Sequence, residues 1–402
     1  MVTTGAAGAA SLPRMVILVL VVITAVAFDF TNGFHDTANA VATSIATGAL
    51  KPRVAVLMSA VLNLVGAFVS IKVAATIAKG IVDPKALESN AGLSLVFAAL
   101  IGAIIWNLIT WYFTLPSSSS HALIGGIIGA TLVASGAHAV MFHGIAKSVI
   151  APAILSPIIC FLVAGIGTYV VYRLMRLITG AEAVRGYRYG QIGSAALVSL
   201  AHGTNDAQKT MGVITLALIA HGSISASHFY VPLWVKLACA CAIAAGTAIG
   251  GWRIINTMGN RITEVESPQG FAAEAASAAV ILSSSYYGYP LSTTHVVSGG
   301  VMGAGAGRKL ESVHWNVAGQ MVTAWVFTIP AAGVVAAATW EIARVFGANS
   351  TAGTIVMAVL AAAAAAGLFT LAQRSKVGAT DLDRTHVSPE REAQLGTAPA
   401  VA

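Results

Sequence analysis

Long apolar stretches separated by short polar segments run through most of the chain. A helix needs about 20 apolar residues to cross a hydrocarbon core of roughly 30 Å. Runs of that size with few or no charges lie near 15–50, 54–78, 94–113, 117–136, 148–172, 192–220, 231–250, 271–288, 290–306, 315–343 and 353–373. The pattern predicts an all-α polytopic membrane protein with about 10–12 transmembrane segments, some of them broken or re-entrant.

The composition excludes several classes of protein. Hydrophobic residues make up 57% of the chain and charged residues only 9%, against about 25% charged in soluble domains. This excludes a soluble enzyme, a disordered protein and a coiled coil. The net charge of +7 requires no nucleic-acid partner, because membrane proteins concentrate Lys and Arg in cytoplasmic loops. The three cysteines lie in apolar stretches and indicate neither disulfides nor a zinc site.

A first polar motif occurs twice inside apolar runs, as Asn32–Asn39 (NGFHDTAN) and His202–Lys209 (HGTNDAQK). Gly and Asn there are expected to break the helix, and the freed backbone groups must line an enclosed, wet cavity. An unpaired Asp inside a membrane costs roughly 2.5–3.5 kcal/mol. Asp36 and Asp206 therefore indicate cation coordination or proton carriage. Helix capping, or pairing with a neighbouring basic side chain, is the structural alternative.

A second motif also occurs twice, as Leu115–His121 (LPSSSSH) and Tyr289–His295 (YPLSTTH). Pro followed by Ser or Thr is typical of a helix start. A helix that begins inside the membrane directs its free N–H groups and positive dipole end into the cavity, which suits an oxyanion. Capping together with Ser/Thr packing between helices is again the alternative. The hydroxyls concerned are Ser118, Ser119, Ser120, Ser292, Thr293 and Thr294.

The spacing of the two motifs predicts a duplicated chain. Asp206 follows Asp36 by 170 positions, and His295 follows His121 by 174. We expect a first repeat over 1–190, a second over 191–373, and a polar, disordered tail over 374–402. Counting crossings from the arginine-rich segment 173–190, taken as cytoplasmic, gives the two repeats opposite orientations. Inverted repeats are typical of secondary transporters, which hold their substrate near the bilayer midplane.

Within the motifs only Lys209 is a permanently cationic side chain, so co-transported cations would have to neutralise most of an anion's charge. This favours symport. An anion channel needs neither inverted halves nor an acidic pair. A membrane enzyme is disfavoured, because no single nucleophile stands out among the symmetric hydroxyls. The chain contains no nucleotide-binding fingerprint, which points to an ion gradient as the energy source.

These segments resemble the inorganic phosphate transporter (PiT) family, and the resemblance fails only in the tail. It rests on Phe30–Thr43 (FTNGFHDTANAVAT), Ala201–Gly212 (AHGTNDAQKTMG) and the two hydroxyl-rich segments. It implies an inverted-repeat fold, often dimeric, in a cell membrane, here the bacterial inner membrane. The partners implied are inorganic phosphate, cations and the lipid bilayer. Glu274 looks like an intramembrane glutamate of the family's second half.

Together, the residues and the resemblance define two sets of candidate site residues. The phosphate-binding candidates are Ser118, Ser119, Ser120, Ser292, Thr293, Thr294, Asn39, Thr204, Asn205 and Gln208. The cation-coupling candidates are Asp36, Asp206, Asn32, Asn39, Asn205, His35 and Glu274. No resident metal or cofactor is expected apart from the co-transported cation.

Two departures from the family pattern bear on the coupling ion. Many sodium-coupled members have Gly-Ala-Asn-Asp where this chain has Gly33-Phe34-His35-Asp36, and Gln208-Lys209 replaces Ala-Asn. Both changes resemble the bacterial branch associated with proton-driven uptake. The sequence therefore favours symport of phosphate with protons, in which phosphate could also travel as a metal–phosphate complex. The alternative is a sodium-coupled phosphate or sulfate symporter.

Overall fold

The computed structural model describes residues 12–83, 92–175, 181–225, 227–347, 350–373 and 377–383. No β-strand occurs in these ranges, which confirms the all-α expectation. The α-helices are α1 (Leu12–Ala46), α2 (Pro52–Gly66), α3 (Lys72–Gly80), α5 (Gly92–Tyr112), α6 (Ser119–Ser135), α7 (Phe142–Ile145), α8 (Ala151–Met175), α9 (Ala181–His221), α10 (Leu233–Ile249), α11 (Trp252–Asn260), α12 (Ser267–Tyr287), α13 (Thr293–Arg308), α14 (Trp315–Val345) and α15 (Thr351–Gln373). Short helical turns are η1 (Ala137–Ala139), η2 (Ala146–Ile150), η3 (Leu310–Ser312) and η4 (Thr380–Leu382).

The long apolar helices make the chain a multi-pass membrane protein. Among the described residues, five helical segments are long and apolar enough to cross a membrane, and α10 with α11, bent by 70° at a short break, can form a sixth. They fall short of the expected ten to twelve spans because α9 carries many polar side chains and because α2, α6 and α13 have only 15, 17 and 16 residues. The bend between α10 and α11 is a broken helix of the expected kind.

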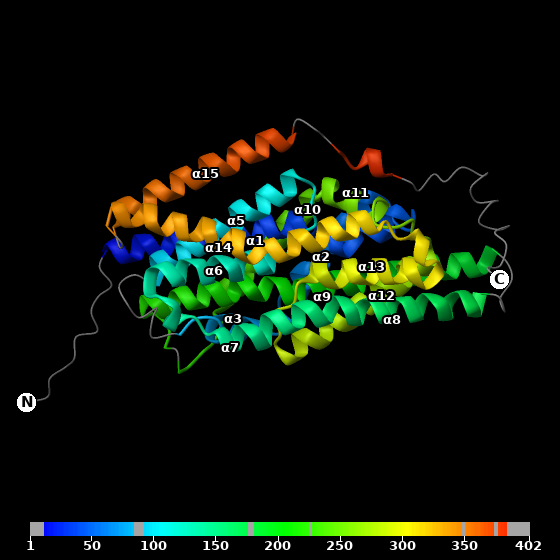
Figure 1. Cartoon of the computed structure of the whole chain (residues 1–402), viewed down its shortest axis with the longest axis horizontal. Coiled ribbons are helices and arrows are strands. Elements are labelled where there is room, and N and C mark those ends of the chain that lie inside the picture. The colour runs from blue at the N-terminus through cyan, green and yellow to red at the C-terminus, as the bar shows by residue number, and fades with distance from the viewer. Residues whose placement is uncertain are drawn as a thin grey trace, which may run out of the picture.

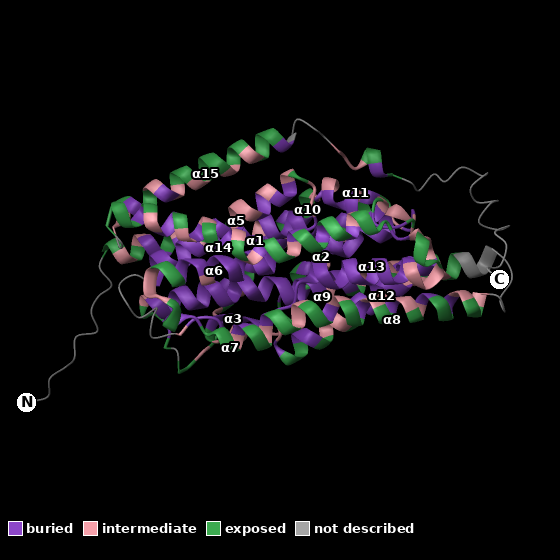
Figure 2. Cartoon of the chain, in the orientation of Figure 1, coloured by how far each residue is buried: buried purple, intermediate pink, exposed green. Residues whose placement is uncertain are grey.

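The helices form an interior that is buried and a periphery that is apolar but exposed. Figure 2 shows α8 and α15 on the outside of the bundle, with many exposed residues, around a buried centre. Ile158, Ile166 and Val359 are among the large apolar side chains that these two helices expose. Such surfaces suit contact with lipid, which has no hydrogen bonds to offer.

Helices α1 and α9 run through their polar motifs without a break, so the expectation that Gly and Asn interrupt them is wrong. The motif glycines instead allow two helices to cross closely. A Cβ added at Gly33 would lie 2.4 Å from the Ile243 carbonyl oxygen of α10. A Cβ at Gly203 would lie 2.3 Å from the Asn63 carbonyl oxygen of α2. Small residues at membrane-helix interfaces permit this approach of one backbone to another.

Contacts between helices come in two matching sets. α1 packs against α10 while α9 packs against α2, and α6 lies between α5 and α14 while α13 lies between α12 and α8. α6 and α13 begin near the centre of the molecule and run toward opposite ends (Figure 1). This arrangement agrees with two opposed units, and the division at 190/191 stays a prediction.

Parts of the predicted peripheral segments lie outside the described residues. These parts are 176–180 of the arginine-rich segment, and 374–376 and 384–402 of the polar tail. Within 377–383, Leu382 is buried among apolar side chains of the helical core.

Candidate functional site

The two hydroxyl-rich segments each start a helix in the protein interior. The Ser118 side chain caps α6 by accepting a hydrogen bond from the His121 N–H over 3.1 Å. Ser292 caps α13 in the same way, accepting from the His295 N–H over 3.2 Å. An N-cap oxygen satisfies a helix N–H that otherwise has no partner. The capping alternative is thus realised at Ser118 and Ser292, which leaves the following hydroxyls available for other contacts.

The starts of α6 and α13 lie next to each other. The Ser120 hydroxyl donates to the Leu291 carbonyl over 3.3 Å. The imidazole rings of His121 and His295 are in edge contact, with centroids 4.6 Å apart. Because each helix N-terminus carries a partial positive charge, the positive ends of the α6 and α13 dipoles lie together in the protein interior.

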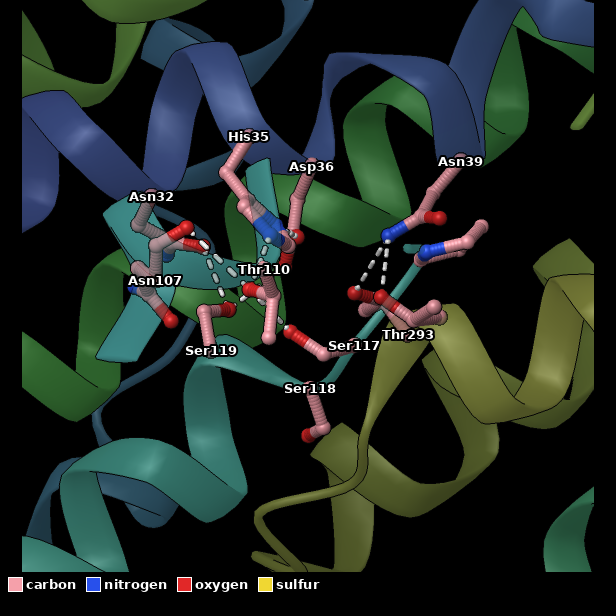
Figure 3. Close-up of polar contacts among 12 residues, drawn as sticks. Asn32, His35, Asp36, Asn39, Asn107, Thr110, Ser117, Ser118, Ser119 and Thr293 are labelled. Atoms are coloured by element: carbon pink, nitrogen blue, oxygen red, sulfur yellow. Dashed lines mark hydrogen bonds and ion pairs between the residues drawn. The ribbon is translucent and has the colours of Figure 1, made fainter. Parts of the chain in front are cut away.

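The first signature acid, Asp36 of α1, faces the start of α6. Its Oδ2 accepts a hydrogen bond of 2.5 Å from the Ser119 hydroxyl, which also lies 2.7 Å from Asn32 Oδ1. Asp36 Oδ1 lies 2.6 Å from His35 Nδ1. All four side chains are buried. Figure 3 shows them pointing toward one another from α1 and α6.

Three polar residues outside the candidates predicted from the sequence complete this group. His35 Nε2 lies 3.2 Å from the Thr110 hydroxyl, which in turn accepts from Ser117 over 2.7 Å. Asn107 joins the group through its backbone carbonyl, which accepts from the Thr110 hydroxyl over 3.1 Å. Its buried side-chain amide (Figure 3) has no hydrogen-bond partner among the described residues. Their signal in the sequence is weak, since Asn107 and Thr110 are single polar residues in an apolar run. We call Asn32, His35, Asp36, Asn107, Thr110, Ser117 and Ser119 the Asp36 cluster.

The second signature acid, Asp206 of α9, has a cationic partner. Its Oδ1 lies 2.6 Å from Lys209 Nζ, and its Oδ2 lies 3.3 Å from His202 Nε2. The Thr293 hydroxyl at the start of α13 donates to the same Oδ2 over 3.3 Å. We call His202, Asp206, Lys209, Ser120 and Thr293 the Asp206 cluster.

Lys209 connects the two helix starts as well as neutralising Asp206. Its ammonium group donates to the Ser120 hydroxyl of α6 over 2.5 Å and to the Leu291 carbonyl just before α13 over 2.6 Å. The side chain is almost completely buried. A buried ammonium needs acceptors of this kind to offset its lost hydration. Lys209 is therefore the fixed positive charge of the site.

The two signature asparagines both reach toward the α13 side of the site. Asn39 donates to Thr294 over 3.0 Å and to Thr293 over 3.3 Å, as Figure 3 shows for Thr293. Asn205 donates to Ser285 over 2.9 Å, at the end of α12. Hydroxyls and amides from both halves of the chain thus meet around the paired acids.

Three of the sequence-predicted residues have other partners. Gln208 Oε1 accepts from the Val73 N–H at the start of α3 over 2.9 Å, and its Nε2 donates to the Thr204 carbonyl. The Thr204 hydroxyl donates within its own helix, to Leu200. Glu274 accepts from Thr43 over 2.5 Å and from Ser194 over 2.7 Å, in a separate polar group between α1, α9 and α12. Gln208 thus caps α3 in this structure, and its predicted contact with phosphate stays untested.

One group of acids and imidazoles in the described residues has the geometry to hold a metal ion. Asp36, His202 and Asp206 each offer a ligand atom, and these atoms lie within 4.8 Å of one another. The Lys209 ammonium already supplies a positive charge to Asp206, and His35 already occupies one oxygen of Asp36. The carboxylates are therefore paired within the protein itself, and we assign no resident metal to them.

Comparison with known proteins gives consistent matches. A model of the phosphate transporter family matches residues 32–336. A probable low-affinity inorganic phosphate transporter of Mycobacterium tuberculosis (strain H37Rv) is 52% identical over 382 residues, which cover 95% of this chain and 89% of that protein. A protein of the same description from Bacillus subtilis is 46% identical over 332 residues, covering 82% of this chain and 97% of that protein.

A solved structure described as the sodium-dependent phosphate transporter has a similar fold. The TM-score is 0.73, and the match covers 82% of this chain and 99% of that chain. Sequence identity is 24%, so this likeness concerns the fold and carries no inference about the coupling ion.

Proposed function

The chain belongs to the phosphate transporter family, and we propose that it is a secondary active transporter that imports inorganic phosphate in symport with protons. Its relatives are described as transporters, and it has no enzymatic role. The observation that carries the proposal is the meeting of two helix N-termini, bearing hydroxyls, with two buried acids and one lysine.

The neutral donors at this place suit a tetrahedral oxyanion. Ser119, Ser120, Thr293 and Thr294 lie in the first turns of α6 and α13, where helix dipoles favour negative charge. The Asn39 amide adds donors beside Thr293 and Thr294. In the proposed complex these groups exchange their present partners for phosphate oxygens, and Lys209 supplies the positive charge.

The balance of buried charge supports protons as the coupling ion. Lys209 pairs with Asp206, so an ionised Asp36 and a bound phosphate would leave uncompensated negative charge in the membrane interior. Charge of that kind is costly unless it is neutralised. Each acid also has an imidazole partner, His35 for Asp36 and His202 for Asp206. Since imidazole can gain a proton near neutral pH, both pairs are suited to carry protons with the anion.

The matched helix contacts support transport by alternating access. α1 with α10 and α9 with α2 form equivalent crossings in the two proposed repeats, and the site lies where the repeats meet. In the proposed cycle, one repeat rocks against the other and exposes the site to one side of the membrane at a time. A channel would need no such pairing of opposed units.

The test is uptake of labelled phosphate into liposomes that contain the purified protein, with pH and sodium gradients imposed separately. We expect accumulation against a phosphate gradient when the outside is acidic, without any need for sodium. Uptake that requires sodium at fixed pH would show that sodium, and not the proton, is the coupling ion. Competition by sulfate would widen the substrate class, and movement only down the phosphate gradient would identify a channel.

A further inference from the structure

Asp29 of α1 is a buried acid that no motif contains. Its side chain is wholly inaccessible to solvent. Neither carboxylate oxygen makes a hydrogen bond of ordinary geometry, and no ion pair of the described residues includes it. Asp29 lies in the same helix as Asp36, about 10 Å away along its axis, given a rise of 1.5 Å per residue.

The other buried acids of the described residues all have polar partners. Asp36 has His35 and Ser119, Asp206 has Lys209 and His202, and Glu274 has Thr43 and Ser194. Asp29 differs from them because neither of its carboxylate oxygens has a hydrogen bond of ordinary geometry.

The surroundings of Asp29 favour its neutral form. The side chains facing it are Asn32 on α1, Thr210 on α9 and Cys239 on α10. The titratable groups that interact with it are Asp206 and the Cys239 thiol, neither of which can supply a positive charge. An isolated buried carboxylate is strongly disfavoured and takes up a proton instead. A buried Asp29 with no cationic partner is therefore expected to bind a proton.

Asp29 is also close to the anion site. Asn32 follows it by about one helical turn, and its Oδ1 lies 2.7 Å from the Ser119 hydroxyl, which donates to Asp36. An anion held by Ser119 would lie beside Asp36 and Asn32, and Asp29 would influence it only through its charge. An ionised Asp29 would repel this anion, whereas a protonated one would not. Proton binding and anion binding therefore assist each other, and by linkage the assistance is reciprocal.

We propose that Asp29 is a proton-binding residue that couples phosphate transport to the pH gradient, an inference that rests on the proposed proton symport. A proton from the outside solution binds to a carboxylate oxygen of Asp29, which favours phosphate binding. After the site opens inward, the proton leaves to the inside solution and the restored negative charge assists phosphate release. Asp29 itself does not contact phosphate. It acts through charge.

The test compares two assays in liposomes for the wild type and Asp29→Asn, whose neutral amide imitates the protonated acid. The first is exchange of labelled for unlabelled phosphate at equal pH, which needs no net proton movement. The second is accumulation driven by a pH gradient of about one unit, to which each coupled proton contributes about tenfold. We expect Asp29→Asn to keep exchange near the wild-type rate and to lose about tenfold in accumulation. The rise in external pH that accompanies phosphate uptake should also be lost.

Cys239→Ala is the matched control, because Cys239 faces Asp29 in the same buried place without carrying an acid. It should keep both exchange and accumulation. Full accumulation by Asp29→Asn would overturn the assignment to Asp29 while leaving proton symport intact. A wild type that moves phosphate without protons would overturn both proposals, so the two failures are distinguishable.

Wild-type protein provides an independent measurement if Asp29→Asn does not fold. Infrared spectra should show the carbonyl band of a protonated carboxylic acid that phosphate binding perturbs. Asp29→Glu, which retains a titratable acid, should keep this band and restore part of the accumulation. A phosphate-insensitive band, or full exchange in Asp29→Glu with no proton movement, would also overturn the proposal.

Discussion

The Asp36 cluster and the Asp206 cluster occupy equivalent positions in the two motif copies but differ in electrostatics. Asp36 is surrounded by an imidazole, hydroxyls and amides, whereas Asp206 forms a close ion pair with Lys209. One acid is thus compensated by a permanent charge, and the other only by groups that can gain or lose a proton. The second copy thus also supplies a fixed positive charge that contacts both helix starts, which the first copy lacks.

The largest expected effect is a difference in protein stability between the variants of Asp206 and Asp36. Asp206→Asn leaves the buried Lys209 ammonium without its counter-ion and should destabilise the protein by about 3–5 kcal/mol. Asp36→Asn should cost much less, because a neutral His35 can still hydrogen-bond to the new amide. Both variants should lose proton-driven phosphate uptake. Thermal unfolding in detergent, followed by intrinsic fluorescence, measures the difference in stability.

The double variant Asp206→Asn/Lys209→Met serves as the control for this comparison. Removing both charges should restore most of the thermal stability without restoring uptake, since no uncompensated charge is then left buried. Equal losses of stability for the two single variants would contradict the distinction between the clusters.

A smaller effect, on the KM for phosphate, is expected when the hydroxyl that faces each acid is removed. Ser119 lies 2.5 Å from Asp36, whereas Thr293 lies 3.3 Å from Asp206. If both donate to phosphate, Ser119→Ala should raise the KM for phosphate about tenfold, as expected for a lost hydrogen bond to a charged group, and Thr293→Val a few-fold less. Initial rates of uptake at varied phosphate concentration measure this. Thr131→Val is the control, because the Thr131 hydroxyl bonds only within α6, and its KM should stay unchanged.

The smallest expected effect concerns a residue that lies beside the Asp206 cluster in sequence. Gln208 caps α3 rather than facing the hydroxyls. Gln208→Ala should therefore lower stability by about 1 kcal/mol, as for the loss of a helix cap, and leave the KM for phosphate unchanged. Unfolding measures the stability and uptake measures the KM for phosphate, both on the same preparation. A raised KM at unchanged stability would place Gln208 among the phosphate contacts.

The paired motifs made most of the site predictable. Asp36, Asp206 and the hydroxyls of both segments were predicted because each motif stands out as polar within an apolar run and occurs twice. The candidates predicted from the sequence do not include Thr110, Ser117, Asn107 or Asp29. Ser117 is one of four consecutive serines, and the other three are isolated polar residues in apolar stretches. What distinguishes these four is contact, or the lack of it, with residues distant in sequence.

Local regularity in the sequence determined the helical class, the membrane location and the two motif pairs, because hydrophobic length and repetition can be read one segment at a time. Tertiary structure decided that Gly33 and Gly203 serve close helix crossings in unbroken helices, and that Lys209 joins Asp206 to two helix starts. It also left Asp29 without a partner. The physical reason is that a buried charge takes its state from whichever groups the packing of other helices brings to it.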